Sequence, residues 1–272
     1  MKTLLLGLAS TFIALVLPGC LQHETTIRLN KDGSGTLTER TTLGAQMLAM
    51  LEQFSALGGD AAAKDPVADM FSAEKAKAKA ATMGEGVTFE KSIPIADGGN
   101  RGAATTYRFA DINTLRISPG ENLKDLSPMA AQAPAMPRPK PVTFTLAGDT
   151  LSIIQPEPEK PAAPAPDAPA GPVPDLAGNP EMEAMMKQML GDMKMSFKLI
   201  LPGGIAETDA TYRDGETLTL MEMEMTKLLE KPDTLKKLAG ADQSNPAAAM
   251  ELMKGLDGVK MESKPKVTVK LR

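Results

Sequence analysis

The sequence predicts an α+β fold: an antiparallel β-sheet of hairpins with helices packed on one face and a disordered Pro-rich insert. Three observations lead to this prediction. Segments that alternate polar and apolar residues follow one another across short turns rich in Gly, Asp and Asn. Other segments carry apolar residues at helical spacing. Strands and helices are grouped along the chain instead of alternating singly, which favours antiparallel pairing.

Alternation and turn residues define the strands. We predict strands at residues 24–29, 36–43, 87–95, 103–112, 142–147, 150–154, 195–201, 205–213, 216–225 and 266–271. Four turns, at 30–35, 97–100, 148–149 and 214–215, join consecutive strands as in hairpins. We expect the first three hairpins to form one six-stranded sheet.

Helical periodicity defines five further segments. We predict helices at residues 43–57, 65–78, 180–193, 226–239 and 246–256. Asp65 before Pro66 is typical of a helix start, with the aspartate as N-cap and the proline at the first helical position. Met182, Met186 and Met189 belong to an apolar stripe along the third helix, which predicts that this helix packs on an apolar surface.

Proline-rich composition sets the domain organisation. The segment 155–178 is rich in Pro and Ala and has few side chains that a core could bury, so we expect a mobile insert. Recognition of a partner by a polyproline stretch is the alternative for this segment. We expect one α+β domain over residues 24–272, and the alternative is two subdomains, 24–154 and 179–272.

The chain begins with the pattern of a bacterial lipoprotein leader. Lys2 precedes an apolar run that ends at Leu17-Pro18-Gly19-Cys20, which resembles a lipobox. We therefore predict a signal peptide at 1–19, lipid attachment at Cys20 and a lipidated tether at 20–23. An uncleaved membrane helix is the alternative, but the apolar run is at the short limit for a span. Leu21 after the cysteine favours the outer membrane in envelopes with two membranes.

Composition excludes several classes of function. Lys2 is the one charged residue of the leader, so the mature chain keeps 34 Asp and Glu against 29 of the 30 Lys and Arg. A net negative exported chain does not suit nucleic-acid binding. Acylation of the single cysteine excludes disulfides and thiol catalysis. The absence of Trp and the presence of two Tyr disfavour carbohydrate stacking.

Four pieces of sequence, taken in order, resemble the LppM-like lipoprotein domain family. They are the hairpin with Asp32-Gly-Ser-Gly35, the segments 107–115 and 142–154, and the segment 197–205 followed by Asp214-Gly215. The resemblance covers the chain from Cys20 to about Leu229. It implies an envelope-facing α+β lipoprotein without an assigned catalytic residue. The chain departs from the family in its longer insert, in the leucines that replace a tryptophan at 218 and 220, and in lacking a C-terminal membrane helix that some members carry.

Several side chains invite a chemical interpretation. Met182, Met185, Met186 and Met189, with Met221, Met223 and Met225, could form a thioether site for Cu(I), but their spacing suits a helix stripe and an inward strand face. Residues 30–35 partly follow a calcium loop, although Thr41 stands where the closing glutamate belongs, so a hairpin turn is preferred.

Three groups of ionisable residues remain. His23 is the sole histidine, and we assign it to the tether because no nucleophile or orienting partner is in view. Glu222 and Glu224 stand two apart on a strand, which favours a solvated face over a catalytic pair. Lys75, Lys77 and Lys79 spread around their helix, which favours a solvated helix over contact with anionic lipid headgroups.

We therefore expect a non-enzymatic, lipid-anchored envelope protein that is structural or binds a partner. It would need no cofactor or metal, bind no nucleic acid, and contact the membrane through N-terminal acyl chains. The alternative is a binder of lipid or another apolar ligand in a cleft between the sheet and the Met-rich helices. A carboxylate-based enzyme ranks third.

Overall fold

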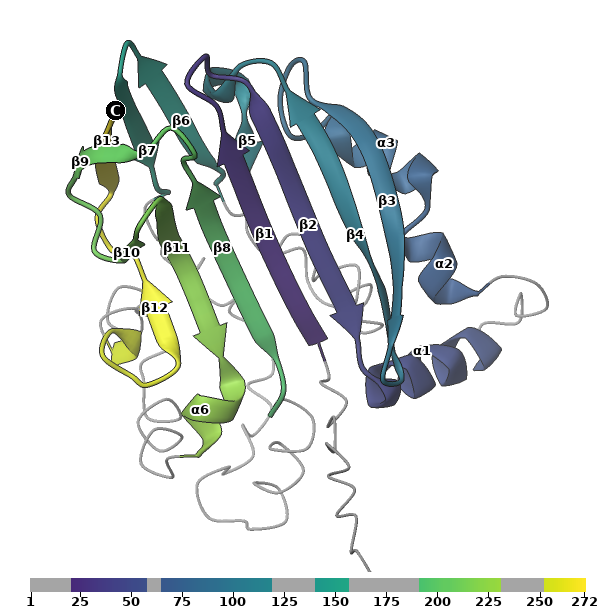
Figure 1. The fold of residues 1–272 in the computed structure, drawn as a ribbon. Helices are drawn as coiled ribbons and strands as arrows, with labels where there is room; N and C mark the ends of the chain where they lie inside the picture. Colours follow the sequence, from purple (N-terminus) through teal and green to yellow (C-terminus); the bar gives the residue numbers. More distant parts are fainter. Residues whose placement is uncertain (1–20, 58–64, 119–139, 157–190, 231–251) are drawn as a thin grey trace, which may run out of the picture.

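The computed structural model describes residues 21–57, 65–118, 140–156, 191–230 and 252–272, and its strands form two sheets (Figure 1). The larger sheet contains β1 Leu21–Leu29, β2 Gly35–Leu43, β3 Thr88–Asp97, β4 Asn100–Phe109, β8 Lys194–Ile200, β10 Arg213–Asp214, β11 Thr217–Glu224 and β12 Val259–Met261. The smaller sheet contains β5 Arg116–Ile117, β6 Val142–Ala147, β7 Thr150–Ile154, β9 Ile205–Thr208 and β13 Lys266–Leu271. The described helices are α1 Ala45–Leu57, α2 Pro66–Met70, α3 Ala73–Ala80, the 3-10 helix η1 Ile112–Thr114 and α6 Met225–Leu229.

Antiparallel pairing dominates both sheets. The order in the larger sheet is β10-β11-β8-β1-β2-β4-β3, with β12 paired to β11, and in the smaller sheet β5-β6-β7-β13-β9. The pair β1–β8 is parallel and brings segments far apart in the sequence side by side in the middle of the larger sheet. The fold is therefore a sheet-rich α+β fold.

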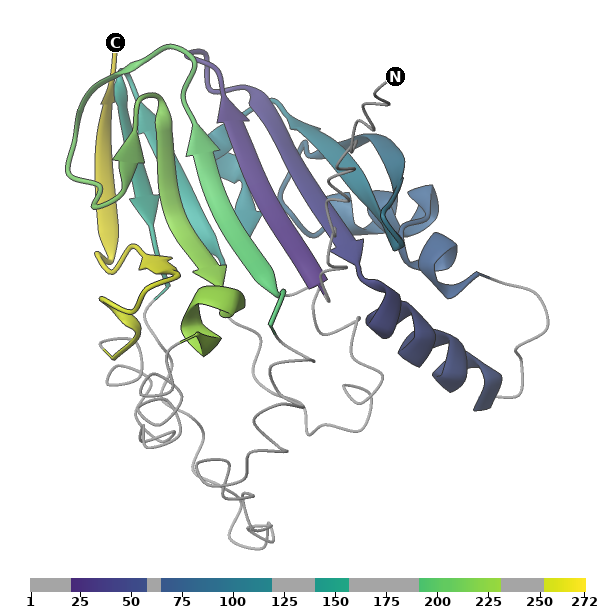
Figure 2. The same ribbon diagram turned by 60° about the horizontal axis from the view of Figure 1, so that its bottom comes forward.

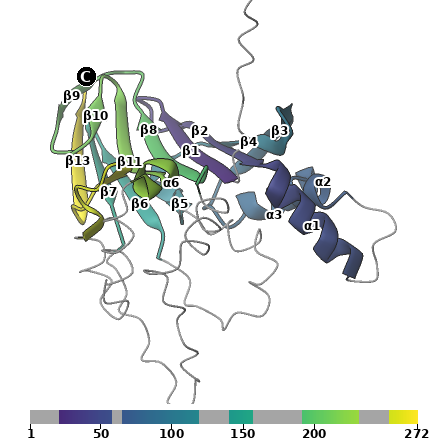
Figure 3. The same cartoon turned by 90° about the horizontal axis from the view of Figure 1, so that it is seen from below.

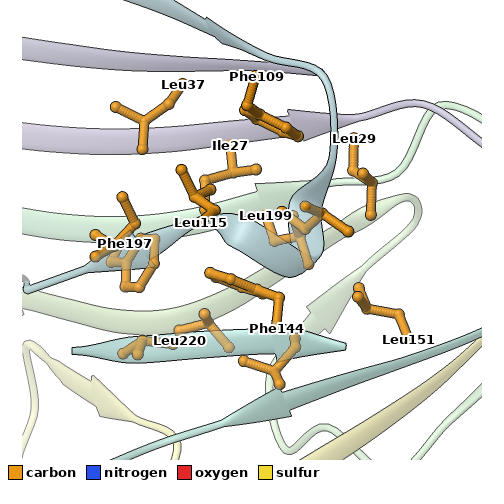
Figure 4. Packing of buried hydrophobic residues seen from close by; sticks show 14 of the residues in the cluster. Ile27, Leu29, Leu37, Phe109, Leu115, Phe144, Leu151, Phe197, Leu199 and Leu220 are labelled. Carbon is orange, nitrogen blue, oxygen red and sulfur yellow. The ribbon is translucent and has the colours of Figure 1, made fainter. Parts of the chain in front are cut away.

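The main hydrophobic core lies between the two sheets (Figure 4). Because successive side chains of a strand point to opposite faces, the apolar inward residues of β1, β2, β4 and β8 that lie toward the β1–β2 turn enter this core. Ile27, Leu37 and Leu199 of the larger sheet are fully buried, as are Leu151 and Ile153 of the smaller one. Burial of this apolar area is the main force that holds the two sheets together.

The prediction of one six-stranded sheet is wrong, because β6 and β7 belong to the smaller sheet. The hairpin predicted over 205–213 and 216–225 is also divided: β9 pairs with β13, and the short β10 pairs with β11. Side chains fix this change of sheet. Asp209 accepts a hydrogen bond from the Thr268 amide at 2.7 Å, and Glu262 accepts one from the Thr211 amide at 2.6 Å.

The predicted helix 65–78 is divided into α2 and α3. Asp65 is the N-cap of α2, as predicted, and accepts from the amides of Val67 and Ala68. Ser72 caps a new helix by accepting from the Lys75 amide. Among the described helices, α3 contributes Ala76 and Ala80 to the main core and η1 contributes Ile112, while the smaller sheet covers most of the face where we expected helices.

Helix α1 lies at the end of the larger sheet where β1 begins and β2 ends, and α6 lies at the same end (Figures 2 and 3). We call this the Leu21 end of the sheet; the β1–β2 turn marks the opposite end. Residues 1–20, most of the insert, most of the Met-rich segment 180–193 and most of the predicted helices 226–239 and 246–256 lie outside the described residues.

Candidate functional site

Strand β1 begins immediately after the predicted lipid-attachment residue. Cys20 itself lies outside the described residues, but Leu21 is already paired with Leu43 of β2 and is only 7% exposed. The prediction that 20–23 form a tether is therefore wrong for residues 21–23. The physical reason is the alternation of side chains along the strand. Leu21, His23 and Thr25 share the inward face of β1 with Ile27, so the strand extends back to Leu21.

His23 is buried, in contrast to its assignment to a tether. Its Nδ1 lies 2.8 Å from the hydroxyl of Thr41 on β2, and its Nε2 lies 3.2 Å from the hydroxyl of Thr25. Hydroxyl groups can donate or accept, so the two threonines satisfy a neutral imidazole in either tautomer. Burial lowers the pKa of His23 below its ordinary value of 6.5, which the Glu39 carboxylate partly opposes and the Lys79 ammonium reinforces.

An ion pair lies beside His23 on the same inward face. Glu39 of β2 stands opposite Thr25 in the register and forms an ion pair with Lys79 of α3. Burial raises the pKa of Tyr107 on β4, and the carboxylate of Glu39 raises it further. This buried polar cluster, made by His23, Thr25, Glu39, Thr41 and Lys79, ties α3 to the larger sheet.

A second apolar cluster lies on the Leu21 side of these polar residues. Its buried members are Leu21, Leu43, Leu48 and Val67. Its partly buried members come from α1, from the end of α2 and from the residue before β8, and they are Met47, Leu51, Met70, Phe71 and Met193. Flexible thioether side chains at a partly exposed rim adapt to varied apolar surfaces. The Leu21 end thus combines the predicted anchor with an adaptable apolar rim.

The opposite, outward face of the larger sheet is charged. Hydrogen bonds from Lys194 and Lys227 lower the pKa of Glu224 to about 2. A hydrogen bond from Lys260 likewise lowers the pKa of Glu222, which also faces Lys198 at 3.6 Å. Both carboxylates are therefore ionised and paired, as expected for a solvated strand face.

The methionines of β11 occupy the inward face, as predicted. Met221 stands opposite the buried Phe197 in the register and packs on the main core, and Met223 stands opposite Met195. Met225 begins α6 instead of continuing the strand. Met182, Met185, Met186 and Met189 lie outside the described residues.

The segment that resembles a calcium loop is the turn between β1 and β2. The Asp32 carboxylate accepts hydrogen bonds from the Ser34 amide at 3.0 Å and from the Ser34 hydroxyl at 2.6 Å. Gly33 has a φ of 87°, which favours glycine. The preferred interpretation as a hairpin turn is confirmed. Within the described ranges, no group of three or more His, Cys, Asp and Glu side chains is arranged to hold a metal.

The three lysines of α3 differ in their surroundings. Lys75 and Lys77 are exposed, and Lys75 pairs with Asp69 at 2.8 Å. Lys79 is half-buried against Glu39, so the interpretation of all three as a solvated face is wrong for Lys79. Across the described segments, no helix is both long and apolar enough to cross a membrane.

Comparison with solved structures finds a weak, fold-level similarity. The NMR structure of the folded domain of LppM from Mycobacterium tuberculosis aligns with 12% identity and a TM-score of 0.31, and the alignment covers 77% of this chain and 85% of that chain. No family model matches the sequence, and comparison with the curated proteins finds no match.

Proposed function

We propose that this chain is a lipid-anchored bacterial envelope protein, acylated at Cys20, that acts by binding another envelope component and not by catalysis. The observation that carries the proposal is the position of Leu21. Because this residue is buried and paired with Leu43, the anchor would join the folded sheet with no spacer. Such an attachment holds one end of the protein at the membrane and presents the rest to partners.

The surroundings of the ionisable groups support a non-enzymatic role. A catalytic base needs access to a substrate proton, whereas His23 is 4% exposed and lies between two threonine hydroxyls. Glu222 and Glu224 are held as ionised partners of lysines, with lowered pKa values that disfavour proton transfer at neutral pH. These groups stabilise the fold and leave binding as the function we propose.

We also propose that the domain is a distant LppM-like lipoprotein domain located in the outer membrane where two membranes are present. The pieces of sequence that carry the resemblance fall on β1–β2, on β4 with η1, on β6–β7, and on β8 with β10–β11. The location rests on Leu21, because this position is not aspartate.

Replacement of Cys20 by Ser tests the anchor. The wild-type product should fractionate with membranes, and mass spectrometry should find a diacylglyceryl group on Cys20 as the first residue of the mature chain. The variant should lose the lipid and either leave the membrane fraction or accumulate as an unprocessed precursor. Unmodified Cys20 in the wild-type protein, or a mature chain that begins elsewhere, would contradict the proposal.

A second candidate function is the binding of a lipid or another apolar ligand. It is favoured by the partly exposed rim of the second cluster, where Met47, Met70, Phe71 and Met193 pack against the buried members. Native mass spectrometry of gently extracted protein separates the two functions. A co-purifying protein supports the first, and a co-purifying lipid that is lost on replacement of Met70 and Phe71 by Gln supports the second.

A further inference from the structure

The apolar side of helix α1 is wider than the part of it that packs against the second cluster. At 3.6 residues per turn, Met50, Met47, Leu51 and Leu48 lie in this order on a continuous arc of about 160°. Leu48 is buried at one edge of the arc, and Met47 and Leu51 pack partly buried against the Leu21–Leu43 cluster. Met50 lies at the other edge, about 160° from Leu48, and is half-buried without being part of that cluster.

The rest of the helix surface is polar or small. Gln46, Glu52 and Gln53 are exposed and lie within a second arc of about 120°, and Glu52 is the one charged residue of the helix. Helix α1 therefore has an apolar arc beside a polar arc, and its single charge is acidic.

The strand register places α1 beside the predicted anchor. Leu21 pairs with Leu43, and α1 begins two residues later at Ala45. Adjacent strands are about 5 Å apart and consecutive Cα atoms 3.8 Å apart, so the Cα of Leu21 lies within about 13 Å of the first residue of α1, and the peptide link to Cys20 adds at most about 3.8 Å. Acyl chains on Cys20 therefore bring the bilayer to this helix.

Cations flank the same end of the sheet. Arg101 of β4 stands opposite Leu43 and forms an ion pair with Asp65, and Lys194 of β8 stands opposite Gln22 and pairs with Glu224 at 2.8 Å. These side chains are partly exposed and lie on either side of the point where the anchor enters the sheet. Each cation is matched by a carboxylate, so paired charges border this end of the sheet.

We propose that α1 is an interfacial membrane helix that inserts Met50 and the exposed part of its apolar arc into the bilayer holding the acyl chains of Cys20. This inference rests on the proposed lipid anchor. The acyl chains fix one point of the protein at the membrane, and α1 supplies a second contact that fixes the rotation of the sheet about that point.

A single tryptophan tests the insertion, because the natural chain contains none. Acylated Met50→Trp protein is reconstituted into vesicles of phosphatidylethanolamine and phosphatidylglycerol with brominated acyl chains. Lys31→Trp, in the turn at the opposite end of β1, is the matched control. An interfacial helix lies about 5–10 Å into the headgroup and acyl boundary, so bromine should quench the Met50→Trp emission by roughly twofold or more and leave the control unchanged.

The outcomes separate this inference from the proposed function. If the protein co-sediments with vesicles but Met50→Trp is quenched no more than Lys31→Trp, the anchor stands and the interfacial helix is contradicted. If the processed protein neither carries lipid nor co-sediments, both proposals are contradicted.

Hydrogen exchange provides a second readout that does not depend on the tryptophan. Amides of residues 45–53 in the acylated wild-type protein on vesicles should exchange roughly tenfold more slowly than the same amides of the Cys20→Ser chain in buffer without lipid. Met50→Glu should remove this protection, whereas Gln53→Glu, which adds the same charge on the polar arc, should retain it. Equal protection in the two variants, or none in the wild type, would overturn the inference.

Discussion

The imidazole of His23 is inside the protein, held between the hydroxyls of Thr25 and Thr41. A buried imidazole that is neutral in the folded state must gain a proton in the interior at low pH or unfold. Glu39 and Lys79 form an ion pair next to His23. The carboxylate of Glu39 raises the pKa of His23, and the ammonium group of Lys79 lowers it. Single residues in this cluster therefore control both stability and its dependence on pH.

Replacement of His23 by Asn should reduce the loss of stability in acid. The folded-state pKa of His23 is lowered from 6.5, so the unfolded chain binds more protons between the two pKa values. The contribution of His23 to the free energy of unfolding is complete above pH 6.5 and is lost as the pH falls toward the folded-state pKa. Urea denaturation across this range measures the difference. Parallel pH profiles for wild type and variant would contradict the assignment.

Replacement of Lys79 by Ala should destabilise the protein by about 2 kcal/mol or more, because it leaves a largely buried carboxylate without its cation. The Glu39 side chain is 11% exposed and that of Lys79 is 26% exposed. Lys75→Ala is the matched control on the same helix. Its pair with Asp69 is 57% and 49% exposed, so the expected cost is about 0–1 kcal/mol. Similar losses for both variants in chemical denaturation would refute the distinction.

The sequence contains a signal for His23 that our prediction did not use. The alternation that identifies Ile27 as inward also places Thr25, His23 and Leu21 inward, but the predicted strand began at Glu24. Glu39 likewise occupies an inward position between Leu37 and Thr41. Its pairing with Lys79 had no local signal, because the two residues are 40 positions apart.

At the scale of elements, local chemistry determined what could be predicted. The turns at 30–34, 98–99 and 148–149 join strands close to their predicted positions, because glycine and side-chain hydrogen bonds fix such turns locally. The division of the helix 65–78 at Ser72 was missed, although serine is a common N-cap. Strand β12 was not predicted, since it is short and depends on β11 for its pairing.

Glu262 holds the segment in which the chain changes sheets. This carboxylate is 1% exposed and accepts hydrogen bonds from the Thr211 amide and hydroxyl and from the amides of Ser263 and Lys264. Its removal leaves these donors without the acceptor that the fold supplies.

We expect Glu262→Ala to lower the free energy of unfolding by roughly 1–3 kcal/mol, the cost of buried donors left unsatisfied. Glu216→Ala, which removes an exposed carboxylate in the nearby β10–β11 turn, should change it by less than about 0.5 kcal/mol. Thermal or urea denaturation of both variants provides the comparison. An equally small effect at both positions would show that Glu262 does not fix the connection.

At the scale of the whole molecule, two sheets share one core where the sequence predicted a single sheet with a helical cover. The hairpins could be predicted because their strands are neighbours in the sequence. The parallel pair β1–β8 and the place of β13 between β7 and β9 could not, because these pairings join distant segments and leave no local pattern.

The central claim is that the larger sheet meets the membrane by its Leu21 end, and spin labelling measures it most directly. Cys20 is the only natural cysteine, and the proposed acylation would block it, so Gln22→Cys and Lys31→Cys would each give one reactive thiol. Both residues are exposed, and the seven strand positions from Gln22 to Leu29 span about 23 Å before the turn that holds Lys31. On vesicles with a paramagnetic metal chelated at the lipid headgroups, the label at 22 should relax strongly and the label at 31 weakly. Equal relaxation at the two sites, or stronger relaxation at 31, would contradict the account.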